Sequence, residues 1–266
     1  MSPINTLTLL TRSGAIVGGL QAFSAVANGI GLSPTPYGKF ANLDQSISKV
    51  SGRTNMMLIY TPAFSFALYK VLELGPLPKC FDDREAITAC ALFFHFAKRI
   101  METLCVHKYS SRVNPVLGGF IGIYYALVCG IILGFQSAVS ADEYLPGCLA
   151  AGAILFLIGE AGNFVHHVYL AALRPKEVDA GDVAAVRESY RIPRAGLFSK
   201  VVCPHYSFEL CAWLGIAVMS QEIHAYLVFL SMATYLGGRS VAQKLWAVEN
   251  IPGFPPERNC LLPGIF

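Results

Sequence analysis

Charged residues are scarce in this chain. Only 14% of its 266 residues are Asp, Glu, Lys or Arg, whereas an ordinary soluble domain carries roughly 25%. Hydrophobic residues make up 54%, and the mean hydropathy is +0.51. The net charge of +3 is small, and the basic residues do not form a stripe of the kind that binds DNA or RNA. The composition therefore predicts an integral membrane protein with no nucleic-acid partner.

Several signatures of common binding sites are also missing. None of the eight cysteines forms a CxxC pair, and most lie in apolar runs, as small buried hydrophobic residues do. The six histidines form neither an HxxxH nor an HxxHH box, so we expect no metal site. The chain has no GxGxxG after a strand, no GxxxxGK(S/T) and no GxSxG. These absences argue against the standard nucleotide-binding and hydrolase folds.

Apolar segments are abundant instead. Seven of them approach the ~20 residues that a helix needs to cross a bilayer. They cover residues 7–32, 56–74, 86–105, 116–139, 145–173, 202–220 and 225–248. Short loops and the lack of an internal repeat predict a single domain, residues 1–266.

The basic residues predict the orientation of these segments. One set of alternating loops holds most of the lysines and arginines outside the spans, and the other set holds only Arg12, Lys79 and Arg84. Basic loops tend to stay in the cytosol. We therefore expect an all-α integral membrane protein of seven transmembrane helices, with a luminal N-terminus and a cytosolic C-terminus.

Ionisable residues lie inside the third segment, where they are costly and often functional. His95, Arg99 and Glu102 are spaced i, i+4 and i+7 and so share a helix face, with Lys98 beside Arg99. Two interpretations are open. Lys98 and Arg99 extend to the membrane interface, or they face inward as a cluster for an anion or a carbonyl group.

The fifth segment carries a polar stripe of Glu160, Asn163, His166 and His167. Asn163 and His167 are one turn apart, and Arg174 lies three turns after Asn163 on the same side. The stripe runs from mid-membrane to the most basic loop, which favours a functional role.

The sixth segment begins beside that loop. His205, Glu209 and Trp213 recur at i, i+4 and i+8, and the adjacent Tyr206 has a phenolic proton to donate. The turn 190–196 and Arg239 of the seventh segment add cations suited to phosphate. Together they predict one amphipathic ligand, with its phosphate-rich end in the loop and a flat or apolar end in the bundle.

Five blocks, in order, resemble the steroid 5α-reductases and the related very-long-chain trans-2-enoyl-CoA reductases. They are HFAKRIMETLCVHKYS at 95–110, GNFVHHVYLAALRP at 162–175, SYRIPRAGLF at 189–198, CPHYSFELCAWLG at 203–215 and FPPERNCLLPGIF at 254–266. A PYGKF opening at 36–40 resembles the reductases that act on steroids. The resemblance implies a seven-helix reductase of the endoplasmic reticulum membrane, in which NADPH reduces a C=C bond conjugated to a carbonyl.

The resemblance also implies roles for individual residues. Lys98 and Tyr206 match a lysine and a tyrosine thought important in the enoyl-CoA branch, so we expect both to be catalytic. His205 stands where the family usually has asparagine, and His167 matches the enoyl-CoA branch, whereas the steroid branch has aspartate. The cofactor-binding part is expected at about 150–266, and the implied cofactor set is Tyr37, Asn163, His167, Arg174, Tyr190, Arg191, His205 and Arg239.

The substrate half departs from the family pattern. In steroid 5α-reductases a glutamate of the second span and a tyrosine of the third hold the substrate carbonyl, and here these positions are Tyr60 and Phe96. Because Phe96 has no hydroxyl, Tyr60 is the expected catalytic donor, with Tyr60, Phe96 and Arg99 in the substrate site. The family's histidine and tyrosine near the end of the last span are Gln243 and Ala247.

Three functions stay open at this point, and each implies a hydrophobic small-molecule ligand. The first is reduction of the Δ4 bond of a 3-oxo-steroid, which the PYGK opening favours. The second is reduction of trans-2-enoyl-CoA in fatty-acid elongation, which KRxxETLxVHKYS and CPxY favour. The third is a catalytically silent relative that binds NADPH or a sterol, as the missing hydroxyl at Phe96 suggests.

Overall fold

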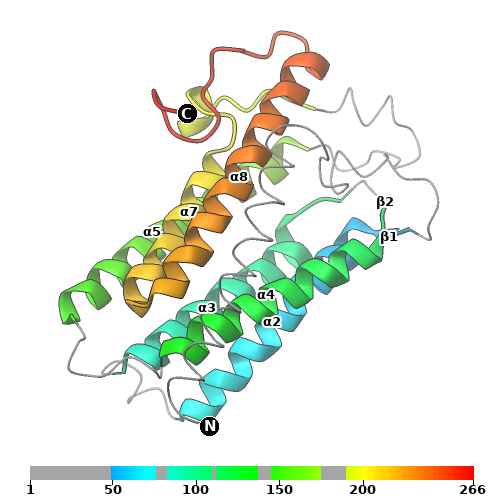
Figure 1. Ribbon diagram of the computed structural model, residues 1–266. Coiled ribbons are helices and arrows are strands. Elements are labelled where there is room, and N and C mark those ends of the chain that lie inside the picture. Colours follow the sequence, from blue (N-terminus) through cyan, green and yellow to red (C-terminus); the bar gives the residue numbers. More distant parts are fainter. Residues whose placement is uncertain (1–48, 76–82, 110–111, 137–144, 175–189) are drawn as a thin grey trace.

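The computed structural model describes residues 49–75, 83–109, 112–136, 145–174 and 190–266. These residues are mainly α-helical (Figure 1). The helices are α2 (Gly52–Leu74), α3 (Arg84–Met101), α4 (Pro115–Gln136), α5 (Pro146–Leu173), α7 (Pro204–Ser220) and α8 (Ile223–Asn250). A two-residue antiparallel pair, β1 (Val50–Ser51) with β2 (Arg112–Val113), joins the beginnings of α2 and α4. The all-α prediction is confirmed for the described residues.

Six of the seven predicted spans coincide with these helices, and the first predicted span, 7–32, lies outside the described residues. Three helices, α2, α4 and α5, are long and apolar enough to cross a membrane. The other three are shorter or more polar. The membrane character of the chain is therefore supported, whereas seven spans and their orientation stay predictions.

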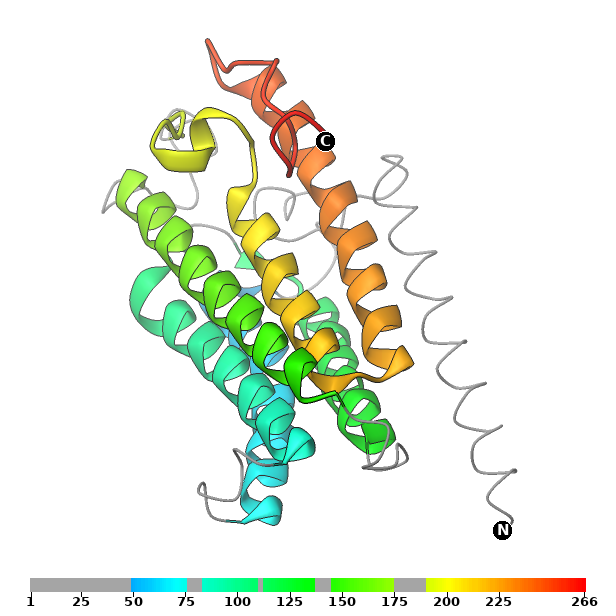
Figure 2. The ribbon, with the colours of Figure 1, turned by 90° about the vertical axis from the view of Figure 1, so that its left-hand side faces the viewer.

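The helices form two groups of three. Helices α2, α3 and α4 pack together, as do α5, α7 and α8 (Figure 1, Figure 2). The groups meet where α3 packs against α7 and α5 and where α4 packs against α8. Phe96 of α3 and Trp213 of α7 are fully buried between the two groups of helices, with ring centroids 6.4 Å apart. The polar faces predicted for the third, fifth and sixth segments therefore meet at the junction of the two groups.

Glycine allows α5 and α7 to approach backbone to backbone. A Cβ atom on Gly215 of α7 would lie 2.5 Å from the backbone nitrogen of Phe156 on α5, and one on Gly159 of α5 would collide with the backbone of Ala212. Small residues at such crossings give van der Waals contact that larger side chains prevent. This close pairing fixes the polar residues of α5 relative to those of α7.

The C-terminal segment, residues 251–266, holds the beginning of α7. Backbone nitrogens of Val202 and Cys203 donate to the carbonyl oxygens of Asn259 (2.8 Å) and Cys260 (3.0 Å). The hydroxyl of Ser207 donates to Leu261 O at 2.6 Å. The first turn of α7, which carries the predicted site residues, is thus anchored by the end of the chain.

Candidate active site

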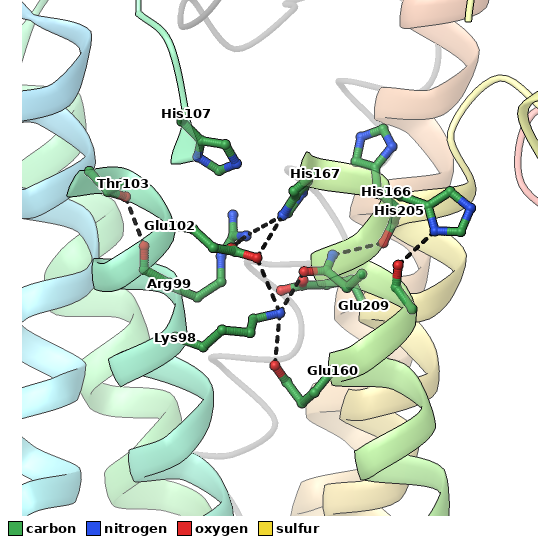
Figure 3. Close-up of polar contacts among 12 residues, drawn as sticks. Lys98, Arg99, Glu102, Thr103, His107, Glu160, His166, His167, His205 and Glu209 are labelled. Atoms are coloured by element: carbon green, nitrogen blue, oxygen red, sulfur yellow. Dashed lines mark hydrogen bonds and ion pairs between the residues drawn. The ribbon is translucent and has the colours of Figure 1, made fainter. Parts of the chain in front are cut away.

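The basic residues of α3 face the interior of the bundle. Lys98 and Arg99 are both buried, which resolves the two open interpretations in favour of an inward cluster. Figure 3 shows both side chains extending from α3 towards α5 and α7. Buried cations need anionic partners, and the neighbouring glutamates supply them.

Lys98 is held by side chains from two elements. Its Nζ donates to Asn163 Oδ1 at 2.6 Å and lies 2.8 Å from Glu160 Oε2, both on α5. It also lies 3.7 Å from Glu102 Oε1. Asn163 in turn donates from Nδ2 to His205 O at 2.9 Å. Two predicted site residues, Lys98 and Asn163, are therefore in direct contact and connect α3 to the beginning of α7.

Arg99 is the centre of a second set of contacts. It forms an ion pair with Glu102, and its Nη1 donates to His167 Nδ1 at 3.0 Å. Its Nη2 donates to the Tyr60 hydroxyl at 2.7 Å. Glu102 begins a π-helical turn, Glu102–Val106, which follows α3. Such turns are rare and frequently occur at functional sites, and here the turn carries a fully buried carboxylate.

Tyr60 and Phe96 have different surroundings. Tyr60 is buried on α2, and its hydroxyl oxygen accepts from Arg99. Phe96 is fully buried, and its ring packs edge-on against His95, Tyr125 and Trp213. Phe96 is therefore part of the aromatic core, and its predicted contact with substrate stays a prediction.

The beginning of α7 places His205 and Tyr206 beside the cluster. The ring of His205 lies 5.5 Å from that of His167 and 4.3 Å from that of Tyr206. The Tyr206 hydroxyl accepts from Gln243 Nε2 of α8 at 2.6 Å. The residue that replaces the family's histidine at position 243 is thus a direct partner of the predicted catalytic tyrosine.

Other predicted cofactor residues lie near the ends of the helices. Arg174, after α5, donates to Lys108 O at 2.6 Å, and its guanidinium lies 6.0 Å from the centre of the Tyr190 ring. Burial raises the pKa of Tyr190, and the charge of Arg174 opposes that shift. Arg239 is buried in α8, whereas Arg191 is exposed. The prediction for Tyr37 falls outside the described residues.

Three carboxylates and one histidine complete the cluster, although they are absent from the predicted site. They are Glu102, Glu160, Glu209 and His95. Their spacing in the sequence already placed all four on the polar helix faces, without an individual role for any of them. Glu102 follows Lys98 by four residues, Glu160 precedes Asn163 by three and Glu209 follows His205 by four, which puts each pair on one helix face.

His166 does not belong to this cluster. Its Nδ1 donates to Gly162 O at 2.6 Å, one turn earlier on α5. Its ring packs against Phe208 and Phe198, with centroids 5.0 and 5.4 Å away. The stripe predicted for α5 therefore contributes Glu160, Asn163 and His167 to the cluster, and His166 to an aromatic contact outside it.

Glu102, His107 and His167 bring one potential metal-ligand atom each within 4.8 Å of one another. Arg99, however, donates to both Glu102 and His167, and Lys98 lies 3.7 Å from Glu102. A divalent cation at this point would meet two fixed positive charges at close range, which disfavours its binding. We therefore assign no metal to these residues.

A family model described as 3-oxo-5-alpha-steroid 4-dehydrogenase matches residues 112–266. The chain belongs to this family. The residues that match the family model cover α4, α5, α7 and α8 of this chain. They therefore include Asn163, His167 and Tyr206. Tyr60, Lys98 and Arg99 precede the matched region.

Individual relatives of the chain are reductases of two lipid classes. A very-long-chain enoyl-CoA reductase of Dictyostelium discoideum is 28% identical over 77% of this chain and 65% of its own length. A steroid 5-alpha-reductase of Gossypium hirsutum is 28% identical over 66% of this chain and 67% of its own length. The 3-oxo-5-alpha-steroid 4-dehydrogenase 1 of Rattus norvegicus is 25% identical over 92% of both chains. This chain thus spans slightly less than two thirds of the Dictyostelium protein.

Proposed function

We propose that this protein reduces a C=C bond conjugated to the carbonyl of a membrane lipid, with NADPH as cofactor, in the endoplasmic reticulum membrane. The first substrate class we propose is a 3-oxo-Δ4-steroid. The observation that carries the proposal is the buried contact between Arg99 and Tyr60, at 2.7 Å.

This contact provides what the reduction of an enone requires. Addition of hydride to the β-carbon puts negative charge on the carbonyl oxygen, and a donor aimed at that oxygen lowers the barrier. Arg99 has only donors, so the Tyr60 oxygen accepts and the phenolic proton of Tyr60 remains to be donated. No acceptor for that proton is found among the described residues. The charge of Arg99 also stabilises an oxyanion bound by Tyr60.

The residues present fit a polar cofactor. Arg99 Nε and His205 Nδ1 are buried and have no hydrogen-bond partner in the described part of the chain. Buried polar atoms in native proteins are nearly always paired, so ligand groups suit these two positions. Asn163, His167 and His205 would hold the nicotinamide end within the bundle, and Arg174, Tyr190, Arg191 and Arg239 the phosphate-bearing end. When bound, NADPH would supply the hydride.

A second substrate class, trans-2-enoyl-CoA, is supported by Lys98 and Tyr206. Both match residues thought important in the enoyl-CoA branch, and each has a defined partner, Asn163 for Lys98 and Gln243 for Tyr206. The enoyl-CoA reductase of Dictyostelium also aligns with most of this chain. The rat steroid dehydrogenase aligns over 92% of both chains, which is why we place the steroid first.

Purified protein in lipid nanodiscs, assayed for NADPH oxidation with a 3-oxo-Δ4-steroid and with a trans-2-enoyl-CoA, tests the proposal. We expect oxidation with the steroid and formation of the saturated ketone. Oxidation with the enoyl-CoA alone would reject the steroid in favour of the second class. A protein that binds NADPH but oxidises none with either lipid would be a catalytically silent relative.

A further inference from the structure

The imidazole of His95 lies between two carboxylates deep in the bundle. Its Nδ1 is 2.6 Å from Glu160 Oε1 on α5, and its Nε2 is 3.5 Å from Glu209 Oε1 on α7. The ring is held edge-on by Phe96 and Trp213, whose centroids are 4.9 and 5.2 Å away. A neutral imidazole has one N–H and one lone pair, so it would direct a lone pair at one of the two carboxylates.

The charges of the cluster also require another proton. Three carboxylates, Glu102, Glu160 and Glu209, are in contact with two permanent cations, Lys98 and Arg99, and with His95. With a neutral His95 this group would have a net charge of −1. A buried unbalanced charge is expensive, and a second proton on His95 makes the group neutral.

His167 is a poorer position for that proton. Its Nδ1 accepts from Arg99 Nη1 at 3.0 Å, and an arginine cannot accept a hydrogen bond in return. The same nitrogen lies 3.1 Å from Glu102 Oε1, but that carboxylate is already paired with Arg99. A protonated His167 would lose the bond from Arg99 and face the guanidinium charge. His95, in contrast, is faced by Glu160 and Glu209 and otherwise by aromatic rings, with Lys98 bound to the far oxygen of Glu160.

We propose that His95 carries a second proton between Glu160 and Glu209, and that this proton, passed through Glu209, protonates the α-carbon of the lipid. The proposal rests on the proposed function, since reduction of a conjugated C=C bond consumes one hydride and one proton. The N–H bond at His95 Nε2 breaks as an O–H bond forms on Glu209. That O–H bond then breaks as a C–H bond forms at the α-carbon with the electron pair of the former C=C bond. Water later returns a proton to His95 through Glu209.

The exposed fractions of the three glutamate side chains identify Glu209 as the residue through which the proton leaves the cluster. Its side chain is 14% exposed, against 4% for Glu160 and 0% for Glu102. The charge of Glu209 also acts on both Tyr60 and Arg99, and Figure 3 shows its carboxylate in the same cluster. The proton therefore leaves through the most exposed of the three carboxylates. His95 and Glu160 are positioning residues, and Glu209 is the proton donor.

The charge state of His95 can be measured without catalysis. In protein with ¹⁵N-labelled histidine at about pH 8, above the ordinary histidine pKa of ~6.5, we expect an imidazolium signature from His95, with both ring nitrogens protonated. It should vanish in His95→Gln and change to a neutral ring in Glu209→Gln. Wild-type protein without an imidazolium at this pH would overturn the proposal.

Kinetics test the delivery step. We expect His95→Gln to lower kcat by about 10²-fold, as loss of general acid catalysis does, and to raise the solvent isotope effect, with NADPH affinity unchanged. Glu209→Gln should lower kcat similarly, which keeps the test valid if His95→Gln does not fold. His166→Gln is the matched control, and its kcat should match that of the wild type. Unchanged kcat and isotope effect in folded His95→Gln would overturn the delivery step. Wild-type protein inactive on both lipids would overturn the proposed function and this step together, while the nitrogen resonances would still decide the charge of His95.

Discussion

Arg99 donates a hydrogen bond to the hydroxyl of Tyr60 at 2.7 Å, and its guanidinium lies 5.0 Å from the centre of the same ring. The two residues come from α3 and α2, and both are buried. Phe96, three residues before Arg99, offers no hydroxyl. The Arg99–Tyr60 pair therefore holds a polarised phenol where α2 and α3 pack together.

Tyr60→Phe removes the proposed donor and keeps the ring. We expect kcat to fall by about 10²-fold, as for other losses of an oxyanion donor, with little change in KM because the contact strengthens in the transition state. Steady-state NADPH oxidation measures both constants. Tyr69→Phe, on the same helix but 58% exposed, is the control and should retain wild-type rates. A Tyr60→Phe variant as fast as wild type would show that the carbonyl is held elsewhere.

Lys98→Met removes the lysine partner of Glu160, which lies 2.8 Å from its carboxylate. Breaking a buried ion pair from one side costs about 3–5 kcal/mol of unfolding free energy, and we expect a loss of this size in denaturant titrations in detergent. The double variant with Glu160→Gln should lose less than the two single losses combined, because the residues contact each other. Lys70→Met, which breaks a partly exposed pair with Glu73, should cost at most about 1 kcal/mol. Additive losses at Lys98 and Glu160 would contradict the coupling.

Arg239→Ala should weaken NADPH more than NADH if its guanidinium reaches the 2′-phosphate. A charged hydrogen bond is worth roughly 1.5–3 kcal/mol, so we expect about 10- to 100-fold weaker NADPH binding in fluorescence titrations. Arg191→Ala tests the exposed arginine of the loop in the same way. Lys70 is a cation of α2 that lies beside Glu85, near the beginning of α3. Lys70→Ala is therefore the control and should leave both affinities unchanged. Equal losses for the two nucleotides would exclude a role in 2′-phosphate recognition.

His107, just after the π-helical turn, makes the stability depend on pH. Burial lowers its pKa to about 4, and the charge of Arg99 acts in the same direction. An unfolded histidine has a pKa of ~6.5, so between pH ~6.5 and about 4 the unfolded chain binds a proton that the folded chain does not. The free energy of unfolding therefore decreases as the pH falls through this range, by up to about 3 kcal/mol. His107→Gln should lose less stability over the same range than wild type, and parallel pH profiles of unfolding would refute this.

Replacing two glycines with alanine should change the stability of the protein in opposite directions. Gly215→Ala inserts a methyl group against the backbone of α5 and should cost about 1–3 kcal/mol of stability, as overpacking does. Gly119→Ala on α4 meets open space and should be neutral or stabilising by up to about 1 kcal/mol, since alanine favours helix. Thermal unfolding of both variants checks this. Equal stability of the two would mean that α5 and α7 can separate at little cost.

The apolar segments of the sequence predicted six of the observed helices closely. The segment 56–74 became α2 (Gly52–Leu74), and 145–173 became α5 (Pro146–Leu173). Such elements follow from local hydrophobicity over the length of a helix, and α2 continues through an internal proline, Pro62. The π-helical turn at Glu102 was not predicted, because its buried carboxylate meets His167 of α5, which is distant in the chain, as well as the nearby Arg99.

The amino-acid sequence by itself determined the helical class, the apolar character and the helix face on which each ionisable residue lies, because these depend on composition and on a period of 3.6 residues. It also placed Lys98, Asn163, His205 and Tyr206 among the site residues, through the family resemblance. Only the tertiary structure decided that Lys98 meets Asn163, that Arg99 meets Tyr60 and that His95 lies between two glutamates. These partners are far apart in the chain, and the packing of α3 against α2, α5 and α7 sets their distances. The tertiary contacts make Glu102, Glu160 and Glu209, which the sequence placed on the polar faces without individual roles, central to the charge of the site.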